Sequence, residues 1–596
     1  MRHLLILFIL LYSSFGFAQN PRLAENYMDQ GEYGKALKIY NKIYEQNKRN
    51  INNLYKVIDI HQQLEQYQQV DSLIIDAEQL MRNNKSLTIE RGYNLTLQGK
   101  DSLAVPYYKE AIAIIDSLPN LTYQIANRFE RRNLLDEAII AYEKGMTANP
   151  NANFKIQLAN LYGQQGNLEK MFVQYIDLIE SNVSYRGRAQ AIFFRYITDD
   201  PDNEGNKLLR KSLLLRLREK QNPIYNQLLS WLFIQQKDFK KAFIQEKAIY
   251  VRTKESTVEL QELAVTAIEE KDLDAAKEIL EYLVQESQVS STRYIAESLL
   301  AKIQADNAIA SEYVTVKTNY EQLLTKYGRD GQTFMLQLDY ADFLTFKASE
   351  PETAVTILTE LENKRLSKFQ KAEVKMLLAD ILVLQEQFNR ALILYSQVQT
   401  DLPNDELAQE AQFRVARTSY YQGDFPWSLT QLKVLRSATS KLIANDAMEL
   451  SLTISDHSLE DTTFVALKTF AKADLKQYQN KRPEAISLYD QLLKNHKGDP
   501  IEDEALLKQA NLYEIEGNLE AAKNNYQTII DNFADGILAD DAFYKLALLY
   551  EEKFDNPNKA QALYERIIYD YADSIHFVDA RRRYRRLRGD ENLSAF

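Results

Sequence analysis

The sequence predicts an all-α solenoid, in which antiparallel helix pairs stack one after another along the chain. Apolar residues recur at i, i+3, i+4 and i+7, the spacing of a single helix face. A pattern of aromatic and small residues returns about every 34 residues, as in stacked repeats. The 596 residues include only 17 Gly and 12 Pro, where an average protein has about 12 % of the two combined. An all-β chain needs turn residues at close spacing, so that class is excluded.

The repeat is defined by an aromatic residue, a small residue nine positions later and a second aromatic four positions after that, as at Tyr513, Ala522 and Tyr526. A further small residue, here Ala510, stands three positions before the first aromatic. The spacing returns, with Met, Leu or one inserted residue in places, at Tyr27/Ala36/Tyr40, Phe129/Ala138/Tyr142, Tyr162/Met171/Tyr175, Leu382/Ala391/Tyr395 and Tyr550/Ala560/Tyr564.

Each repeat is expected to form two helices joined by a tight turn. Gly31, Gly166 and Gly517 stand between the two halves of their units, where a helix end favours the left-handed backbone conformation. The small residue lets the two helices cross closely, since a larger side chain would separate their axes. One pair cannot bury its apolar face alone, so neighbouring pairs must stack.

This pattern resembles the tetratricopeptide repeat (TPR) family over most of residues 19–588. The resemblance implies a right-handed superhelical solenoid whose first helices line a concave groove. We expect an N-terminal TPR array at 19–180, a diverged helical middle at 181–330 and a C-terminal array at 331–576. A basic capping helix at 577–588 and a tail at 589–596 follow. Within the middle, Gly205–Lys220 and Ile303–Tyr327 are predicted as long helices.

Residues 1–18 are predicted to be a secretory signal peptide. Arg2 and His3 precede an apolar run from Leu4, and small residues at Gly16 and Ala18 mark a cleavage site. The run is shorter than the roughly 20 residues that span a bilayer, and no later stretch is longer. The chain has no Cys, so a lipid anchor on cysteine is excluded. We expect an exported protein in the periplasm or at the periplasmic face of the outer membrane, without a transmembrane segment after cleavage.

The last two units carry a further signature. Residues 531–537 (DNFADGI) are echoed by residues 569–575 (YDYADSI), and Asp-Ala opens the next helix at Asp541 and Asp579. This is similar to the TPR units of bacterial envelope proteins such as the outer-membrane-protein assembly lipoprotein and the Tol–Pal coordinator. The acidic residues also favour these helix starts through the helix dipole.

The sequence offers no catalytic, cofactor or metal motif. It has five His and no Cys, and it lacks HExxH, GxSxG, P-loop and GxGxxG patterns. The run Ser455-Asp456-His457-Ser458 is set aside because triad residues converge from separate segments. Glu297-Ser298 matches the dipeptide of lytic transglycosylases, but the following Gly-Leu-Met-Gln segment is absent. We therefore predict no enzyme activity, and the net charge of −12 argues against nucleic acid as a partner.

Two surfaces are predicted to bind partners. The TPR resemblance places the residue after the small Ala on the concave groove, where its polar side chain can bond a peptide backbone. These residues are Glu25, Asn127, Asn160, Asp380 and Asn511. The alternative is that they only solvate an exposed face.

The second surface is the basic helix at 577–588. Its cations are Arg581, Arg582, Arg583, Arg585, Arg586 and Arg588, and they suit an anionic partner such as acidic lipid headgroups or an acidic protein. The alternative is a helix that only caps the last repeat.

These observations predict a non-catalytic exported TPR scaffold that binds peptide segments or partner proteins. Envelope assembly, secretion or motility complexes are the setting that the resemblance suggests. One alternative is an envelope enzyme acting on cell-wall glycan, and another is a purely structural subunit of a larger complex.

Overall fold

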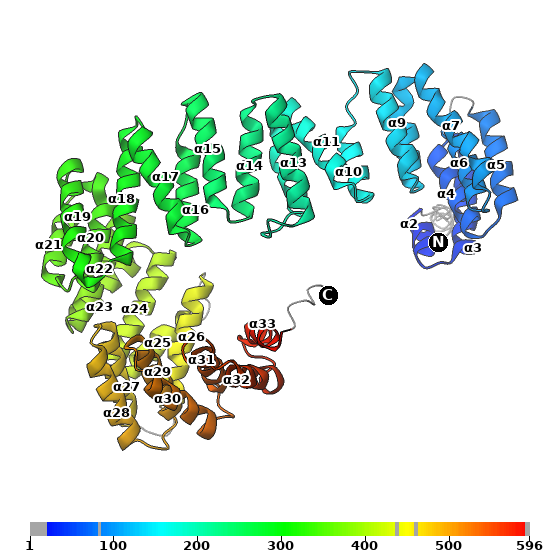
Figure 1. Cartoon of the computed structure of the whole chain (residues 1–596). Coiled ribbons are helices and arrows are strands. Elements are labelled where there is room, and N and C mark those ends of the chain that lie inside the picture. The colour runs from blue at the N-terminus through cyan, green and yellow to red at the C-terminus, as the bar shows by residue number, and fades with distance from the viewer. Residues whose placement is uncertain (1–20, 82–84, 436–439, 458–462, 590–596) are drawn as a thin grey trace, which may run out of the picture. The chain divides into compact units, whose positions relative to one another are not determined.

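The computed structural model describes residues 21–81, 85–435, 440–457 and 463–589. All regular elements in these ranges are α-helices or short 3-10 helices, and none is a strand. The predicted all-α class is therefore confirmed. Consecutive helices run antiparallel and stack side by side, as in a TPR-like solenoid (Figure 1).

The chain divides into two compact units, residues 1–279 and 280–596, and each is described by itself. The division falls within α17 (Leu273–Glu286). The first unit contains α2 (Pro21–Asp29), α3 (Tyr33–Gln46), α4 (Ile51–Gln63), α5 (Tyr67–Leu80), α6 (Leu87–Thr96), α7 (Asp101–Ser117), α8 (Thr122–Arg131), α9 (Leu135–Ala148), α10 (Lys155–Gln164), α11 (Leu168–Ser181), α12 (Arg186–Phe193), α13 (Glu204–Glu219), α14 (Pro223–Gln235), α15 (Phe239–Thr253) and α16 (Val258–Glu269).

The second unit continues the same pairing. It contains α18 (Ser290–Asn307), α19 (Tyr313–Tyr327), α20 (Phe334–Phe346), α21 (Pro351–Glu362), α22 (Lys368–Leu384), α23 (Phe388–Asp401), α24 (Glu406–Gln422), α25 (Phe425–Leu435), α26 (Lys441–Asp456), α27 (Val465–Tyr478), α28 (Arg482–Asn495), α29 (Glu502–Ile515), α30 (Leu519–Asn532), α31 (Ala539–Glu552), α32 (Pro557–Asp570) and α33 (Phe577–Arg588).

One expected long helix is interrupted. The predicted helix Ile303–Tyr327 is broken between α18 and α19, where Ala310–Glu312 forms a 3-10 turn. Glu312 explains the break, since its carboxylate accepts a hydrogen bond from the backbone N–H of Ile309 at 3.0 Å and so caps a new helix start. The other expected long helix is α13.

The turn inside a pair follows from its glycine and asparagine. Gly517 has φ +77°, which a glycine adopts without steric cost. The Asn518 side chain then accepts a hydrogen bond from the N–H of Ala521 at 3.3 Å and caps α30. The helices that meet at this turn cross at Ala522, which is fully buried beside Ala510 and Tyr526.

A buried ion cluster ties three successive first helices of the first unit together. The Glu90 carboxylate on α6 has no exposed surface, and it pairs with Arg128 and Arg132 on α8. The guanidinium group of Arg128 lies 3.6 Å from the ring centre of Tyr55 on α4, and that of Arg132 lies 4.6 Å from the ring centre of Tyr93 on α6. Burial alone would raise the pKa of Glu90, but attraction to Arg132 and Arg128 outweighs it, so the pKa is lowered.

This cluster should make the first unit sensitive to acid. A carboxyl whose pKa is lowered on folding stabilises the folded state above its unfolded pKa of about 4.3, and this contribution is lost as the pH falls through the lower, folded value. At pH 7, Glu90→Gln should cost about 3–5 kcal/mol because it leaves two buried arginines short of an acceptor. The cost should shrink as the pH falls below about 4. Urea unfolding followed by Trp231 fluorescence in a Trp427→Phe background measures it, with the exposed Glu45→Gln as control.

The helix crossing can be tested in the second unit. Ala522→Leu should overpack the crossing of α29 and α30 and lower the free energy of unfolding by about 1–3 kcal/mol. Urea unfolding followed by Trp427 fluorescence gives the value. Asn524→Leu places the same side chain at an exposed position of α30 and should change stability far less. Equal stability of both variants would contradict the assigned crossing.

Candidate functional site: a groove in the second unit

A tyrosine on the second helix of a pair donates a hydrogen bond to the first helix, 15 residues earlier. We call this bond the interhelix latch. It joins Tyr175 to Asn160 at 3.0 Å, Tyr395 to Asp380 at 2.5 Å, Tyr489 to Asp474 at 2.5 Å and Tyr526 to Asn511 at 2.9 Å. Because the tyrosine body fills the space between helices, its hydroxyl reaches a partner that a buried hydroxyl requires.

Three of the predicted groove residues are therefore engaged inside their own repeats. Asn160, Asp380 and Asn511 are all latch acceptors. Asp380 is only 8 % exposed, and Arg414 pairs with its second oxygen. Asp380 thus joins two repeats instead of facing an open groove.

The other two predicted groove residues have different partners. Asn127 accepts a hydrogen bond from Nε of Arg131 at 3.1 Å, and the hydroxyl of Tyr142, 15 residues later, is buried without a hydrogen bond in the described structure. Glu25 pairs with Lys56 at 3.2 Å on an exposed surface. Partner binding by these residues stays a prediction.

The same position of two further repeats was missed by the sequence reasoning. Arg417 follows Ala416 on α24, and Asp474 follows Ala473 on α27. The aromatic spacing is weak in these repeats, but the small residue before each was a usable signal. The structure brings both side chains to one cavity.

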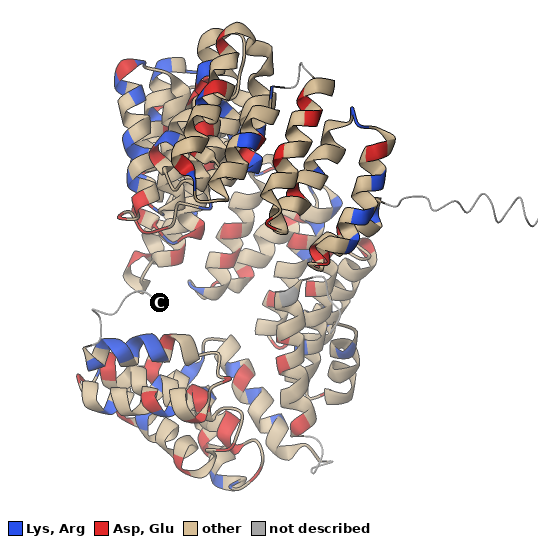
Figure 2. Cartoon of the chain, turned by 90° about the vertical axis from the view of Figure 1, so that its right-hand side faces the viewer, with Lys and Arg blue, Asp and Glu red and all other residues tan. Residues whose placement is uncertain are grey.

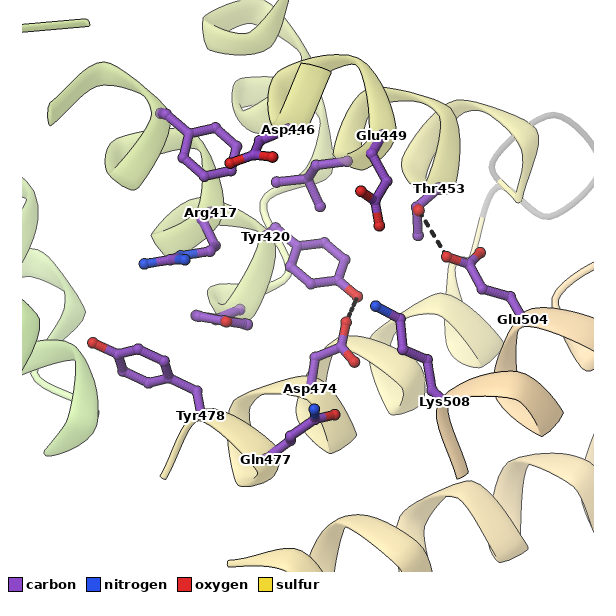
Figure 3. A pocket seen from close by; sticks show the side chains of 13 residues that line it. Arg417, Tyr420, Asp446, Glu449, Thr453, Asp474, Gln477, Tyr478, Glu504 and Lys508 are labelled. Carbon is purple, nitrogen blue, oxygen red and sulfur yellow. Dashed lines mark hydrogen bonds between the residues drawn. The ribbon is translucent and has the colours of Figure 1, made fainter. Parts of the chain in front are cut away.

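This cavity has a volume of about 450 Å³ and lies between α24, α26, α27 and α29 (Figure 3). Its wall combines aromatic rings with charged groups. The lining residues used below are Phe413, Arg417, Tyr420, Asp446, Glu449, Thr453, Asp474, Tyr478, Glu504 and Lys508.

Asp474 is held at the floor of the cavity by two hydroxyls. Tyr420 donates to one oxygen at 2.8 Å and Tyr489 to the other at 2.5 Å. Burial raises the pKa of Asp474, and the nearby Lys508 and the two hydroxyls offset only part of that rise. Burial lowers the pKa of Lys508, but attraction to Asp474 and Glu504 outweighs it and the pKa is raised. Lys508 therefore remains a cation at neutral pH.

The constellation around Lys508 repeats an earlier one with a different outcome. In the earlier copy, Arg414 on α24 pairs with Asp380 and, at 3.0 Å, with Glu410. The equivalent set of the later copy is Asp474, Glu504 and Lys508, at the same spacings in the sequence.

In the later copy the acceptors have other partners. Both oxygens of Asp474 accept from tyrosines, while Glu504 accepts from Thr453 at 2.8 Å and lies 2.9 Å from Nε2 of His457. No hydrogen bond joins Lys508 to another residue of the described ranges, and its side chain points toward the Tyr420–Asp474 bond in Figure 3. The later copy is thus open where the earlier one is closed.

A second cavity of about 640 Å³ adjoins the first and shares Glu449, Thr453, Glu504 and Lys508 with it. It extends to α31 and adds the apolar side chains of Leu452, Leu507, Pro500, Ile537 and Leu538. We call the two cavities together the acidic groove. Its carboxylates are Asp446, Glu449, Asp456, Asp474, Asp503, Glu504 and Asp541, against the cations Arg417, Lys508 and Lys545.

The described residues of the two catalytic candidates bond to neighbouring groups. His457 faces Glu504, while Ser455 donates to the Leu452 carbonyl at 3.3 Å and to Asp456 at 3.4 Å, and Ser458 lies outside the described residues. Both oxygens of Glu297 accept from Lys326 at 2.8 Å. The described residues also contain no group of His, Cys, Asp and Glu that could hold a metal ion.

The basic C-terminal helix is partly committed to the last repeat. Arg583 pairs with Asp579 at 2.7 Å and with Glu551 at 3.1 Å, and Arg586 pairs with the same Glu551. Arg582 also pairs with Asp579. Arg581 and Arg585 are exposed, and the basic positions along this helix are visible in Figure 2. No helix within the described ranges is long and apolar enough to cross a membrane.

The tetratricopeptide repeat model matches residues 504–536 and 541–574, which cover α30 and α32 and most of α29 and α31. The chain therefore contains tetratricopeptide repeats, and two of the helices that line the acidic groove, α29 and α31, belong to them. No curated protein matches the sequence.

Solved structures resemble the chain over most of its length at low identity. A chain of Naa15/Naa10 bound to HypK is 14% identical, with 91% of this chain and 92% of that chain covered and a TM-score of 0.25. Yeast Tom70 is 14% identical over 94% and 98%, with a TM-score of 0.30. A chain of the APC/C hetero-tetramer Cut9-Hcn1 is 12% identical, with 97% of this chain and 98% of that chain covered and a TM-score of 0.22. These values carry no information on partners.

The interhelix latch can be measured by removing its donor. Tyr489→Phe should lower the free energy of unfolding of the second unit by about 1–3 kcal/mol, because a buried carboxylate loses one of its two hydroxyl donors. Tyr142→Phe is the matched control: its hydroxyl has no partner in the described structure, so its loss should be neutral or stabilising. Urea unfolding gives the free energy of unfolding of each variant, followed by the fluorescence of Trp427 for Tyr489→Phe and of Trp231 for Tyr142→Phe. Equal costs would show that the latch contributes nothing.

Proposed function

We propose that the chain is a non-catalytic scaffold that binds a segment of a partner protein in the acidic groove. The observation that carries the proposal is the open constellation of Lys508, Asp474 and Glu504, which stands where the equivalent residues of an earlier repeat close on one another. A groove lined by polar groups and by apolar side chains suits an extended segment, which needs both hydrogen bonds and apolar contacts.

The charge of the groove indicates a cationic segment. Seven carboxylates against three cations give a negative field, which attracts and orients a positively charged partner. Asp446 and Glu449 are exposed and stand one turn apart on α26, on the wall of the cavity that aromatic side chains also line (Figure 3). Two exposed carboxylates at this spacing suit a Lys or Arg side chain.

The cellular setting is part of the proposal. The signal-like residues 1–18 and the repeated acidic turns before α31 and α33 support an exported protein in the periplasm or at the periplasmic face of the outer membrane. There it would belong to an envelope assembly, secretion or motility complex. Five of the six arginines of the proposed anionic-partner patch on α33, all except Arg583, are exposed. A purely structural subunit would leave the acidic groove empty, so peptide binding separates the two functions.

Charge reversal in the groove tests the proposal. The mature chain should bind a fluorescent Lys- and Arg-rich peptide more tightly than an Asp- and Glu-rich peptide of equal length. Asp446→Lys with Glu449→Lys should weaken binding of the basic peptide about tenfold or more, that is by at least about 1.4 kcal/mol. Fluorescence anisotropy gives the affinities.

Glu360→Lys with Glu484→Lys is the matched control, since both residues are exposed in the same unit and neither lines the acidic groove. The control should keep most of the affinity. Similar loss in both variants, or no preference for the basic peptide, would contradict the groove as the binding site. If the basic peptide binds as expected, a photo-crosslinker at position 449 in intact cells would identify the natural partner.

A further inference from the structure

The outward face of α15 in the first unit carries an unusual stripe. Lys240, Ile244, Lys247 and Val251 follow one another at spacings of four, three and four residues, which places them on one side of a helix. Ile244 and Val251 are 59% and 55% exposed. The buried Ala242 lies on the other side, and the ring of the buried Phe243 lies beside the stripe, 5.6 Å from the ammonium of Lys247. The stripe therefore alternates cations with large apolar side chains that no described residue covers.

A second stripe of the same kind lies on α13. Lys207, Lys211, Leu214 and Arg218 are spaced by four, three and four residues, and Leu214 is 44% exposed. A shallow cavity of about 600 Å³ runs along this stripe, and Arg210, Leu215, Leu217 and Gln221 complete its lining. The opposite side of α13 is buried through Leu209 and Leu213.

The two stripes lie on helices of the first unit that share a neighbour. α14 and α15 form a helix pair, and α14 also packs against α13, which in turn packs against α11, the second helix of the preceding pair (Figure 1). Arg252 at the end of α15 donates to the carbonyl of Gln221, just after α13, at 3.2 Å and to its side chain at 2.8 Å. The ends of the two helices are therefore side by side. We call this surface the α13–α15 face.

The charge of this face differs from that of the chain, whose net charge is −12. Neither stripe contains Asp or Glu. Lys207 and Lys211 pair with Asp202 and Glu169 at 3.0 and 2.8 Å, but all four side chains are largely exposed, so these pairs contribute little. The combination is not general among the helices, because α17 contains one Lys and four acidic residues.

We propose that the α13–α15 face binds the surface of a bilayer that contains acidic lipid headgroups. The Lys and Arg side chains would meet the lipid phosphates with their charged ends, while Leu214, Leu215, Ile244 and Val251 enter the boundary between headgroups and acyl chains. Long Lys side chains suit this arrangement, since their apolar stems can lie beside these residues while the ammonium stays in water.

A flat lipid surface fits the face better than a single partner helix does. A helix packs by placing one ridge into one groove, so it would cover one stripe, whereas the two stripes on α13 and α15 expose apolar and basic groups over a wider area. A bilayer meets both at once. This function is separate from peptide binding by the acidic groove, which lies in the other unit.

Vesicle binding tests the inference with the mature chain. We expect co-sedimentation with vesicles of phosphatidylcholine and phosphatidylglycerol, little with phosphatidylcholine alone, and a loss of binding as salt is raised. The combined substitutions Lys207→Gln, Arg210→Gln, Arg218→Gln and Lys240→Gln should weaken binding about tenfold or more. Ile244→Ser with Val251→Ser should also weaken it, because the apolar contribution is lost.

The control removes the same charge elsewhere, by Gln at the exposed Lys38, Lys42, Lys109 and Lys472, and should keep the binding. Circular dichroism checks that all variants are folded. Absence of binding to the acidic vesicles, or equal loss in the control, would overturn the proposal. Binding of an acidic amphipathic peptide, lost in the α13–α15 variant and without any vesicle binding, would instead assign the face to a protein partner.

Discussion

The hydrogen bond between a tyrosine on the second helix and an Asp or Asn on the first is the contact that ties together four of the helix pairs. In the pairs of Tyr395 and Tyr526, a small buried residue, Ala391 or Ala522, lets the two helices approach closely, whereas Met171 stands at this position in the pair of Tyr175. The tyrosine then fills the interhelix space with its ring and binds across it with its hydroxyl. Packing and polar satisfaction are therefore achieved in these pairs by one residue type at one position.

The same acceptor position also decides where the second unit is open. Around Asp380, the latch acceptor is shared with Arg414, and the repeats close on one another. Around Asp474, a second tyrosine from α24 takes the place of the cation, and Lys508 is left facing a cavity. A small change in which residue donates to a buried carboxylate thus leaves an open cavity where the earlier copy has a closed contact, because a buried acceptor can satisfy only a limited number of donors.

The two proposed surfaces use different physical properties. The acidic groove is concave, combines buried carboxylates with tyrosine hydroxyls, and selects by shape and by hydrogen bonding. The α13–α15 face is open, basic and partly apolar, and its interaction would depend on charge and on apolar insertion. Each lies within one unit and is argued from the contacts of that unit alone.

The sequence by itself determined the all-α class, the helix pairs and their turns, because apolar spacing, small residues and glycine act locally along the chain. It also located the residues that follow the small Ala and predicted that Asn160, Asp380 and Asn511 bind a partner. The fold engages all three with tyrosines, and Asn511 also lines the second cavity of the acidic groove. That choice depends on which side chains meet across a helix pair, 15 residues apart. Only the tertiary structure decided which acceptors bond to a tyrosine and where, as at Lys508, a charged group faces a cavity. The reason is that side chains from several helices compete for the same hydrogen-bond acceptors.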